Sequence, residues 1–365
     1  MLPPAPPSYD GRGLVNLVAE IEHRLTGGAS SPRLEPAIAD GIPSGDGVVL
    51  VLFDGLGSMQ LDHRAATDLR ATRIAEIDAP FSTMTTVSLA TIATGVPPVR
   101  HGLIGYKMWL PEHSTIVNTI HMSTAWGEPI DGLDHATFLP PDNLWERLAS
   151  AGCEPIVVQP GNFEATPLTK TLYRGARFES YWSATEAASA TIDLAGPGRM
   201  VFLYLPHVDF AAHVNGQDSP EYVEALATVN RVWATLSMRL PDTITLVGTA
   251  DHGHVDIPES RRFRLPDHST PTSRITEDGR ILYVHGDGSG YADEFGGVWH
   301  PLGDVDWWGP GVPHPAFALR RPDGIVFLPP GVAVLTPHGN PRLTGFHGGL
   351  EPDERLIPVL SRSSA

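Results

Sequence analysis

Three apolar segments that each lead into an aspartate constrain the fold of this chain more than any other feature of its sequence. They are Gly47–Phe53, Met200–Leu205 and Thr243–Gly248, followed by Asp54, Asp209 and Asp251. Short, uninterrupted runs of β-branched and aliphatic residues are typical of strands that are buried on both faces. Segments with helical spacing lie between these runs. The alternation predicts an α/β fold, with a mostly parallel central sheet covered by helices on both faces.

The segments between the strands carry the apolar spacing of amphipathic helices. We expect helices over Leu14–Leu25, over Asn143–Ala151 with Asp142 as its N-cap, and over Pro220–Leu240. Pro155–Gln159 is a weaker candidate for a fourth strand of the sheet. Because sites in open α/β sheets lie beyond the carboxyl ends of the strands, the three aspartates mark the expected site.

A later part of the chain has a different composition. Asp256–Pro341 is rich in proline, glycine, aspartate and histidine, with short strand candidates at Arg280–His285, Gly324–Leu328 and Val332–Leu335. We therefore expect one catalytic domain over residues 1–365, with a smaller insert or cap at about 256–341.

The overall charge excludes several classes of protein. A formal net charge of −17 repels polyanions, so we expect no nucleic-acid partner. No apolar run approaches the roughly 20 residues of a membrane span, so no membrane partner is expected either. The single cysteine, Cys153, excludes a disulfide framework and a zinc site made of cysteines alone. The first ten residues lack the basic and apolar regions of a secretory signal, which favours a cytoplasmic location.

Several carboxylates and imidazoles stand at positions where they could bind metal together. They are Asp54, Asp209, His213, Asp251, His252 and His347. Each one alone has a common structural explanation, such as a turn aspartate or a helix cap. Asp209 and His213 are four residues apart, so a helix would place both on one face. Three carboxylates with three imidazoles suit two divalent cations, and zinc is the first choice, although manganese and iron accept the same ligands.

A segment dense in hydroxyl groups is the candidate source of a nucleophile. It spans Ala79–Gly95, and a helix beginning near Thr86 would direct its N-terminal N–H groups at an anion. Composition alone leaves four candidates open. They are Ser82, Thr83, Thr85 and Thr86.

Several motifs together resemble the alkaline phosphatase superfamily, and within it the nucleotide pyrophosphatase/phosphodiesterase and phosphonoacetate hydrolase branch. The matching segments are Leu52–Gly55, Thr85 with Thr94–Gly102, Asp209 with His213, Asp251–Gly253 and Gly345–Gly348. They occur in the family's order over residues 48 to 350 or so. The resemblance implies an α/β/α sandwich with a variable cap.

The resemblance also implies a role for each site residue. Thr85 stands nine residues before Thr94, where the family has its catalytic threonine. The implied ligands of one metal are Asp209, His213 and His347, and those of the other are Asp54, Asp251, His252 and the Thr85 oxygen. The implied reaction has two steps, in which Thr85 attacks phosphorus and the phosphothreonine is then hydrolysed.

The sequence departs from the family pattern at one position near the nucleophile. The phosphodiesterases have a phosphate-binding asparagine 21 residues after the threonine, where this chain has Tyr106. The Tyr106 hydroxyl and the charge of Lys107, one of only two lysines, are the candidate phosphate contacts in its place. Phe81 and Trp109 either line a pocket for the leaving group or belong to the core.

These observations predict a two-metal hydrolase that cleaves phosphodiester or phosphoanhydride bonds of small, anionic, nucleotide-like substrates. A phosphonate hydrolase or phosphomonoesterase on the same scaffold is the alternative within enzymes, and a catalytically inert binding protein is the alternative outside them. We expect structural roles for His101, His207 and His254. The oligomeric state is left open.

Overall fold

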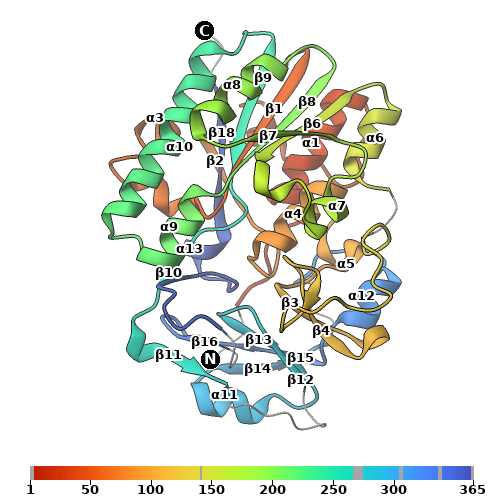
Figure 1. Cartoon of the computed structure of the whole chain (residues 1–365), viewed down its shortest axis with the longest axis vertical. Helices are drawn as coiled ribbons and strands as arrows, with labels where there is room; N and C mark the ends of the chain where they lie inside the picture. Colours follow the sequence, from red (N-terminus) through yellow and green to blue (C-terminus); the bar gives the residue numbers. More distant parts are fainter. Residues whose placement is uncertain (1–3, 140–141, 266–273, 304–306, 336–338, 363–365) are drawn as a thin grey trace.

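A seven-stranded sheet forms the centre of the molecule (Figure 1). The computed structural model describes residues 4–139, 142–265, 274–303, 307–335 and 339–362. The strands, in spatial order, are β2 (Arg73–Asp78), β18 (Leu356–Ser361), β9 (Ile244–Thr249), β1 (Gly47–Phe53), β8 (Arg199–Leu205), β6 (Glu154–Pro160) and β7 (Arg177–Tyr181). All neighbours are parallel except β18, which runs antiparallel to both β2 and β9.

The three strands that precede the aspartates lie side by side in the middle of this sheet. β1 pairs with β8 on one edge and with β9 on the other, both in parallel. Every residue of β1 and of β9 is buried, as expected for strands covered on both faces. The predictions for these strands and for β6 are confirmed. Because the strands are parallel neighbours, their carboxyl ends meet at one edge of the sheet.

Helices cover both faces of the sheet in two groups (Figure 1). One group consists of α1 (Leu14–Thr26), α4 (Thr85–Thr94), α6 (Leu144–Ser150) and α7 (Pro167–Leu172). The other consists of α3 (Thr67–Ala71), α8 (Ala184–Leu194), α9 (His207–Asn215) and α10 (Pro220–Arg239). The molecule is therefore a mixed α/β protein with a mostly parallel central sheet, as predicted.

The longest helix, α10, shows why the sequence pattern was sufficient for these elements. The side chain of Ser219 accepts a hydrogen bond from the Tyr222 N–H and so caps the helix. Its apolar face, including Leu226, Val229 and Trp233, is buried against the sheet and neighbouring helices. Burial of each such side chain stabilises the fold by about 2 kcal/mol.

The predicted cap of α6 was wrong by one residue. The side chain of Asn143 accepts the Glu146 N–H, and the Glu146 carboxylate in turn accepts the Asn143 N–H. This reciprocal capping box leaves Asp142 outside the helix start.

A four-stranded antiparallel sheet occupies much of the predicted insert (Figure 1). Its order is β12 (Arg274–Glu277), β13 (Ile281–His285), β15 (Gly324–Phe327) and β14 (Val298–Pro301). Alternate residues face opposite sides: Ile281 and Tyr283 join the main core, whereas Leu282 and Val284 join a smaller one. The strands predicted in this segment are confirmed, and the division into one domain with an insert stays a prediction.

Several shorter elements lie outside these two sheets. They are the pairs β10 (Val255–Asp256) with β17 (Gly345–Phe346) and β11 (Arg262–Arg264) with β16 (Ala333–Leu335), and the helices α2 (Pro36–Ala39), α5 (Pro98–His101), α11 (Ser289–Phe295), α12 (Pro315–Arg320) and α13 (Pro352–Arg355).

A small three-stranded sheet after α5 was not predicted from the sequence. It consists of β3 (Lys107–Leu110), β4 (Thr115–Asn118) and β5 (Ser123–Thr124), all antiparallel. The Thr119 Oγ1 lies 3.0 Å from the Thr86 Oγ1, which joins this sheet to the beginning of α4. The sheet therefore forms one wall beside the N-terminus of that helix.

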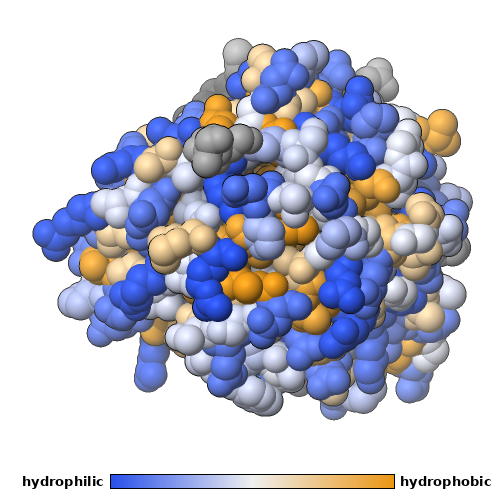
Figure 2. All heavy atoms as spheres, turned by 90° about the horizontal axis from the view of Figure 1, so that it is seen from above, coloured by the Kyte–Doolittle hydropathy of each residue, from blue (hydrophilic) through white to orange (hydrophobic). Residues whose placement is uncertain are grey.

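The end of the molecule shown in Figure 2 is mostly hydrophilic, with hydrophobic residues in small groups between the polar ones. None of the helices in the described part of the chain is both long and apolar enough to cross a bilayer.

Candidate functional site

Three carboxylates meet at the carboxyl edge of the central sheet. Backbone hydrogen bonds join their elements: the Asp209 N–H donates to the Asp54 carbonyl at 3.0 Å, and the Gly55 N–H donates to Asp251 Oδ1 at 3.0 Å. Asp54 and Asp251 are buried, and the Asp209 side chain is 19% exposed. The sheet therefore brings together the three aspartates that the sequence predicted as neighbours.

Gly55 allows this close approach. Its φ of +74° lies in the left-handed region, which residues with a Cβ adopt at a cost. A Cβ at this position would lie 2.8 Å from the Asp209 Cα and 2.9 Å from the His254 Nε2. Glycine after Asp54 is thus required by the packing of the site itself.

Imidazole rings surround the Asp209 carboxylate. Asp209 Oδ1 lies 2.9 Å from His254 Nε2, 3.3 Å from His213 Nε2 and 3.8 Å from His347 Nε2. His213 and Asp209 share one face of α9, as their spacing predicted. The fourth ring, His252, stacks on His347 at 3.6 Å between centroids. The structure thus gathers all the histidines predicted as ligands and adds His254.

In two of the rings, the hydrogen bond made by Nδ1 determines that Nε2 faces the cluster. His213 Nδ1 lies 2.8 Å from the Gly345 carbonyl oxygen, and His347 Nδ1 lies 2.7 Å from the Thr83 carbonyl oxygen. A carbonyl only accepts, so each Nδ1 carries the hydrogen. In its neutral form, each ring would present the lone pair of Nε2 to the cluster, as a metal ligand does.

The buried carboxylates repel one another. Burial, and then the charges of Asp209 and Asp251, raise the pKa of Asp54 well above its usual value, although the Tyr204 hydroxyl donates to its Oδ2. Asp251 Oδ2 is buried and has no hydrogen-bond donor among the described residues. An acceptor left without a donor in the protein interior is costly, and a cation would relieve both that cost and the repulsion.

Burial and neighbouring charges also shift the pKa values of Asp209 and of the histidines. Burial opposes ionisation of Asp209, but the neighbouring His213 and His254 hold the pKa of that carboxyl well below its usual value. Burial, and then the charge of His252, lower the pKa of His347 well below its usual value, which keeps this ring neutral. Burial opposes protonation of His213, but the charge of Asp209 raises the pKa of this ring above its usual value, so a metal ion bound there must displace a proton.

Two overlapping sets of ligand atoms are close enough to hold cations. The sets are Asp54, Asp251 and His252, and Asp209, His252, His254 and His347. Within each set, the ligand atoms lie within 4.8 Å of one another. The donor set, with its unpaired carboxylate oxygen, fits divalent metal ions.

Thr85 is the hydroxyl residue that faces this cluster. It is the first residue of α4, and its Oγ1 lies 3.0 Å from His252 Nε2 and 3.5 Å from Asp54 Oδ1. The other three candidates donate to acceptors elsewhere: Ser82 to a carboxylate, and Thr83 and Thr86 to backbone carbonyls. Geometry therefore separates Thr85 from the residues that composition left equivalent.

A cleft of about 420 Å³ opens beside Thr85. Its lining includes Tyr106, Lys107, Asp209, His213 and His347, so the candidate phosphate contacts and part of the histidine cluster share one space. Lys107 is only 8% exposed, and its Nζ lies 5.5 Å from the centroid of the Tyr106 ring.

Comparison of the sequence with family models identifies the family of this chain. A model of the type I phosphodiesterase/nucleotide pyrophosphatase family matches residues 48–295, which is more than half of the chain and includes most of the cluster. The chain belongs to this family. No curated protein matches the sequence.

Known structures of this family share the fold. An inactive variant of murine ectonucleotide pyrophosphatase/phosphodiesterase 5, in complex with AMP, superimposes with a TM-score of 0.64 at 15% identity, covering 86% of this chain and 87% of the murine one. Phosphonoacetate hydrolase from Sinorhizobium meliloti 1021, bound to phosphonoacetate, gives a TM-score of 0.62 at 16% identity, covering 88% and 91%. Both proteins are similar to this chain in fold, and the low identity carries no statement about substrate.

Two aromatic residues considered for the cleft belong to the core. Phe81 is fully buried in a cluster with Tyr283, Trp307 and Trp308. Trp109 is 8% exposed, and Arg274 Cζ lies over it, 3.9 Å from the centroid of the Trp109 ring. Neither lines the cleft, so the core explanation is confirmed for both.

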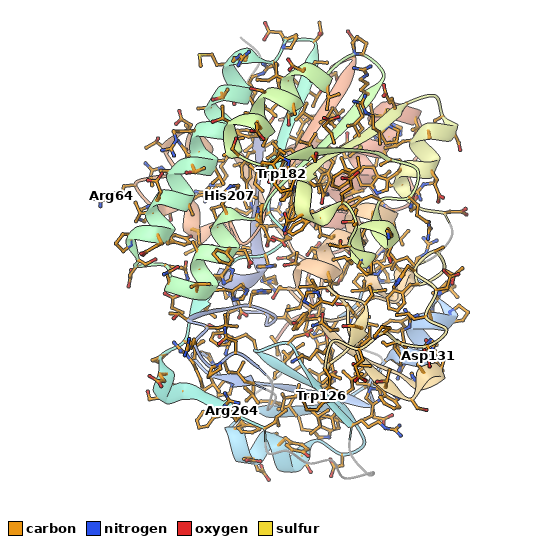
Figure 3. The ribbon with its side chains drawn as sticks, viewed as in Figure 1. Arg64, Trp126, Asp131, Trp182, His207 and Arg264 are labelled. Atoms are coloured by element: carbon orange, nitrogen blue, oxygen red, sulfur yellow. The ribbon has the colours of Figure 1, made fainter. Side chains whose placement is uncertain are left out.

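His101 makes structural contacts, as expected, whereas the structural role expected for His207 stays a prediction. His101 Nδ1 accepts the Leu103 N–H at 3.2 Å, and its Nε2 lies 3.1 Å from Thr91 Oγ1. His207 is the first residue of α9 (Figure 3), and burial lowers the pKa of its ring.

The expectation for His254 needs correction. Burial lowers the pKa of this ring to about 4, so it is neutral at pH 7, and its Nε2 contacts Asp209 directly. The available signal was its position two residues after His252, directly beyond the end of β9.

Two further residues of the cleft carried no signal in the sequence. They are Asn118, the last residue of β4, and Asp278, which follows β12. Asn118 ends a short hairpin with β3, whereas Asp278 lies between the paired strands β12 and β13 and meets Tyr106 from 172 residues away.

Removing one carboxylate tests the repulsion among them. In metal-free protein at neutral pH, we expect Asp54→Asn to raise the Tm by roughly 2 °C or more, because the raised pKa of Asp54 means that folding either buries a charge or takes up a proton, and asparagine does neither. Zinc in hundredfold excess over Kd stabilises wild-type protein by about 2.7 kcal/mol, and this gain should largely disappear in the variant. Differential scanning fluorimetry with EDTA and with zinc measures both effects.

The matched control is Asp62→Asn, an exposed aspartate at the end of the 3₁₀ turn Met59–Asp62. It should leave the Tm and the zinc response unchanged. A full zinc response in Asp54→Asn would exclude Asp54 from the metal site.

Proposed function

We propose that this protein is a metal-dependent hydrolase that cleaves phosphodiester or phosphoanhydride bonds of small nucleotide-like substrates through a phosphothreonine on Thr85. The observation that carries this proposal is the position of Thr85 Oγ1, at the start of α4 and within 3.5 Å of both His252 and Asp54. Family membership supports it, because a phosphodiesterase or pyrophosphatase needs a nucleophile and cation ligands in one cleft.

Two sets of residues would hold divalent cations. Asp54, Asp251, His252 and Thr85 form one set, and the other set is Asp209, His213 and His347. The pair of ions, most simply zinc, would neutralise the carboxylates and stabilise the charge of the phosphoryl group during transfer. The buried and unpaired Asp251 Oδ2 supports this assignment, because a cation gives it the partner that the protein does not.

The proposed reaction has two steps, formation of the phosphothreonine and its hydrolysis. Thr85 Oγ1 forms a bond to phosphorus as the bond from phosphorus to the leaving oxygen breaks, and the leaving group takes up a proton. Water then attacks the phosphothreonine, and Thr85 regains its hydrogen as inorganic phosphate or a phosphomonoester departs. His252 and Asp54 orient the Thr85 oxygen in both steps, and the first N–H groups of α4 stabilise the anion nearby.

A phosphonate hydrolase or phosphomonoesterase is the second candidate. The similarity in fold to phosphonoacetate hydrolase and the burial of Lys107 in the cleft favour it, because a substrate with an extra negative charge needs an extra cation. Lys107 is the only lysine or arginine that lines the described part of the cleft. One cation suits a diester better than a dianionic monoester, so we rank the diester first. A catalytically inert binding protein would not need Thr85 beside the ligand cluster.

Replacement of the nucleophile tests the proposal directly. We expect Thr85→Ala to lower kcat by more than about 1000-fold, because it removes the proposed nucleophile and the neighbouring Thr86 hydroxyl is bonded to the Gly105 carbonyl instead. Turnover of bis(p-nitrophenyl) phosphate and zinc content by mass spectrometry are measured together. Zinc should remain bound, since the carboxylates and histidines are intact.

Thr86→Ala is the matched control for this experiment. Its hydroxyl donates to the Gly105 carbonyl, so its loss should leave kcat within about tenfold of wild type. An inactive Thr86→Ala with an active Thr85→Ala would show that the nucleophile is wrongly assigned.

Substrate preference distinguishes the two candidate activities. For zinc-loaded protein, we expect kcat/KM to be at least about tenfold higher for bis(p-nitrophenyl) phosphate than for p-nitrophenyl phosphate, a difference of ~1.4 kcal/mol. Lys107→Met should lower activity on the monoester more than on the diester. The matched variant Lys170→Met, at an exposed position on α7, should change neither. A preference for the monoester would favour the second candidate.

A further inference from the structure

The backbone of Tyr106 is held on both sides. Its N–H donates to Asp278 Oδ1 at 2.9 Å, and its carbonyl accepts the Thr119 N–H at 2.9 Å. Asp278 is only 1% exposed and also accepts the Ser82 hydroxyl at 2.7 Å. Because both backbone groups are engaged, the side-chain hydroxyl is the part of Tyr106 left to meet a ligand in the cleft.

The orientation of the Asn118 amide is determined by its neighbours. Asn118 Oδ1 accepts the Ile120 N–H at 3.0 Å and the His121 N–H at 3.3 Å, in the turn that follows β4. An amide nitrogen cannot accept these bonds, so the oxygen must lie on this side and Nδ2 on the other. Nδ2 lies 2.9 Å from the Tyr106 hydroxyl oxygen.

The direction of that last hydrogen bond follows. Asn118 Nδ2 only donates, so the Tyr106 hydroxyl accepts and its own hydrogen must point elsewhere. Within the described part of the chain, no acceptor for this hydrogen is found. Tyr106 and Asn118 line the same cleft as Thr85, and Thr119 joins their sheet to α4 through Thr86.

We propose that Asn118 is a positioning residue that directs the Tyr106 hydroxyl hydrogen toward a non-bridging oxygen of the phosphoryl group in the cleft. This inference rests on the proposed function of the cleft. Negative charge grows on the equatorial oxygens during phosphoryl transfer, and a hydrogen-bond donor held in place stabilises that charge without having to reorient. Asn118 acts through Tyr106, and Tyr106 makes the contact.

Asn118→Asp tests the direction of the hydrogen bond while it preserves the shape of the side chain. The carboxylate still accepts the two backbone N–H groups, but it now accepts from the Tyr106 hydroxyl instead of donating to it. We expect kcat on the diester to fall about 100-fold, close to the loss in Tyr106→Phe, with KM little changed.

Combining the two changes separates positioning from simple charge repulsion. In the Tyr106→Phe background, Asn118→Asp should cost at most a further twofold or so in kcat, because the hydroxyl that it misdirects is already absent. If the added charge itself were responsible, the double variant would lose the product of both effects. Asn162→Asp adds the same charge at an exposed position outside the described lining of the cleft and should retain nearly full activity.

Binding of orthovanadate, followed by isothermal titration calorimetry on zinc-loaded protein, gives a readout that does not need turnover. Asn118→Asp and Tyr106→Phe should weaken vanadate binding by about tenfold or more, and Asn162→Asp should not. Wild-type protein without turnover would contradict the proposed function, while these affinities would still report on the pair. Wild-type kcat and vanadate affinity in Asn118→Asp would overturn the inference.

Discussion

Electrostatic repulsion among three buried carboxylates is the constraint on which the site of this protein depends. Asp54, Asp209 and Asp251 meet because β1, β8 and β9 are parallel neighbours whose carboxyl ends share one edge. Removal of such charges from water is costly unless opposite charge is placed among them. The imidazoles around Asp209 supply part of this compensation, and the unpaired Asp251 Oδ2 shows that it is incomplete. The arrangement of the sheet therefore supports the proposed cation site at this edge.

The rest of the molecule positions Thr85, the proposed nucleophile, and a cleft next to that charge. α4 begins with Thr85, and its neighbour Thr86 joins the helix to the sheet of β3, β4 and β5. The second antiparallel sheet contributes Asp278, which holds the backbone at Tyr106. Segments that are distant in the sequence thus converge on one cleft, and each contributes polar groups that the others hold in place.

The sequence was sufficient where structure is determined by local pattern. β1, β8 and β9 are short apolar runs, and α9 places Asp209 and His213 four residues apart, so these elements and the edge they form could be predicted. The resemblance of several motifs to one family selected Thr85 among four hydroxyls. The error at Asp142 arose because either of two adjacent capping residues fits the pattern, and the reciprocal bond with Glu146 decides between them.

The sequence was insufficient where pairing is non-local. β18 includes Pro358, and proline is unfavourable in the interior of a sheet. The strand nevertheless pairs with both β2 and β9, so it lies inside the central sheet. The contact of Asp278 with Tyr106 likewise joins positions 172 residues apart. The contact of Asn118 with Tyr106 is local, but the hairpin of β3 and β4 that makes it was not predicted. No residue type or spacing in the sequence indicates such contacts.

Anomalous diffraction from crystals grown with zinc measures the central claim most directly. The account predicts two anomalous peaks per chain in the cleft, one among Asp54, Asp251 and His252 and the other among Asp209, His213 and His347. Data collected on both sides of the zinc absorption edge identify the element at each peak. A cluster without anomalous density at saturating zinc, or zinc bound only outside the cleft, would contradict the account.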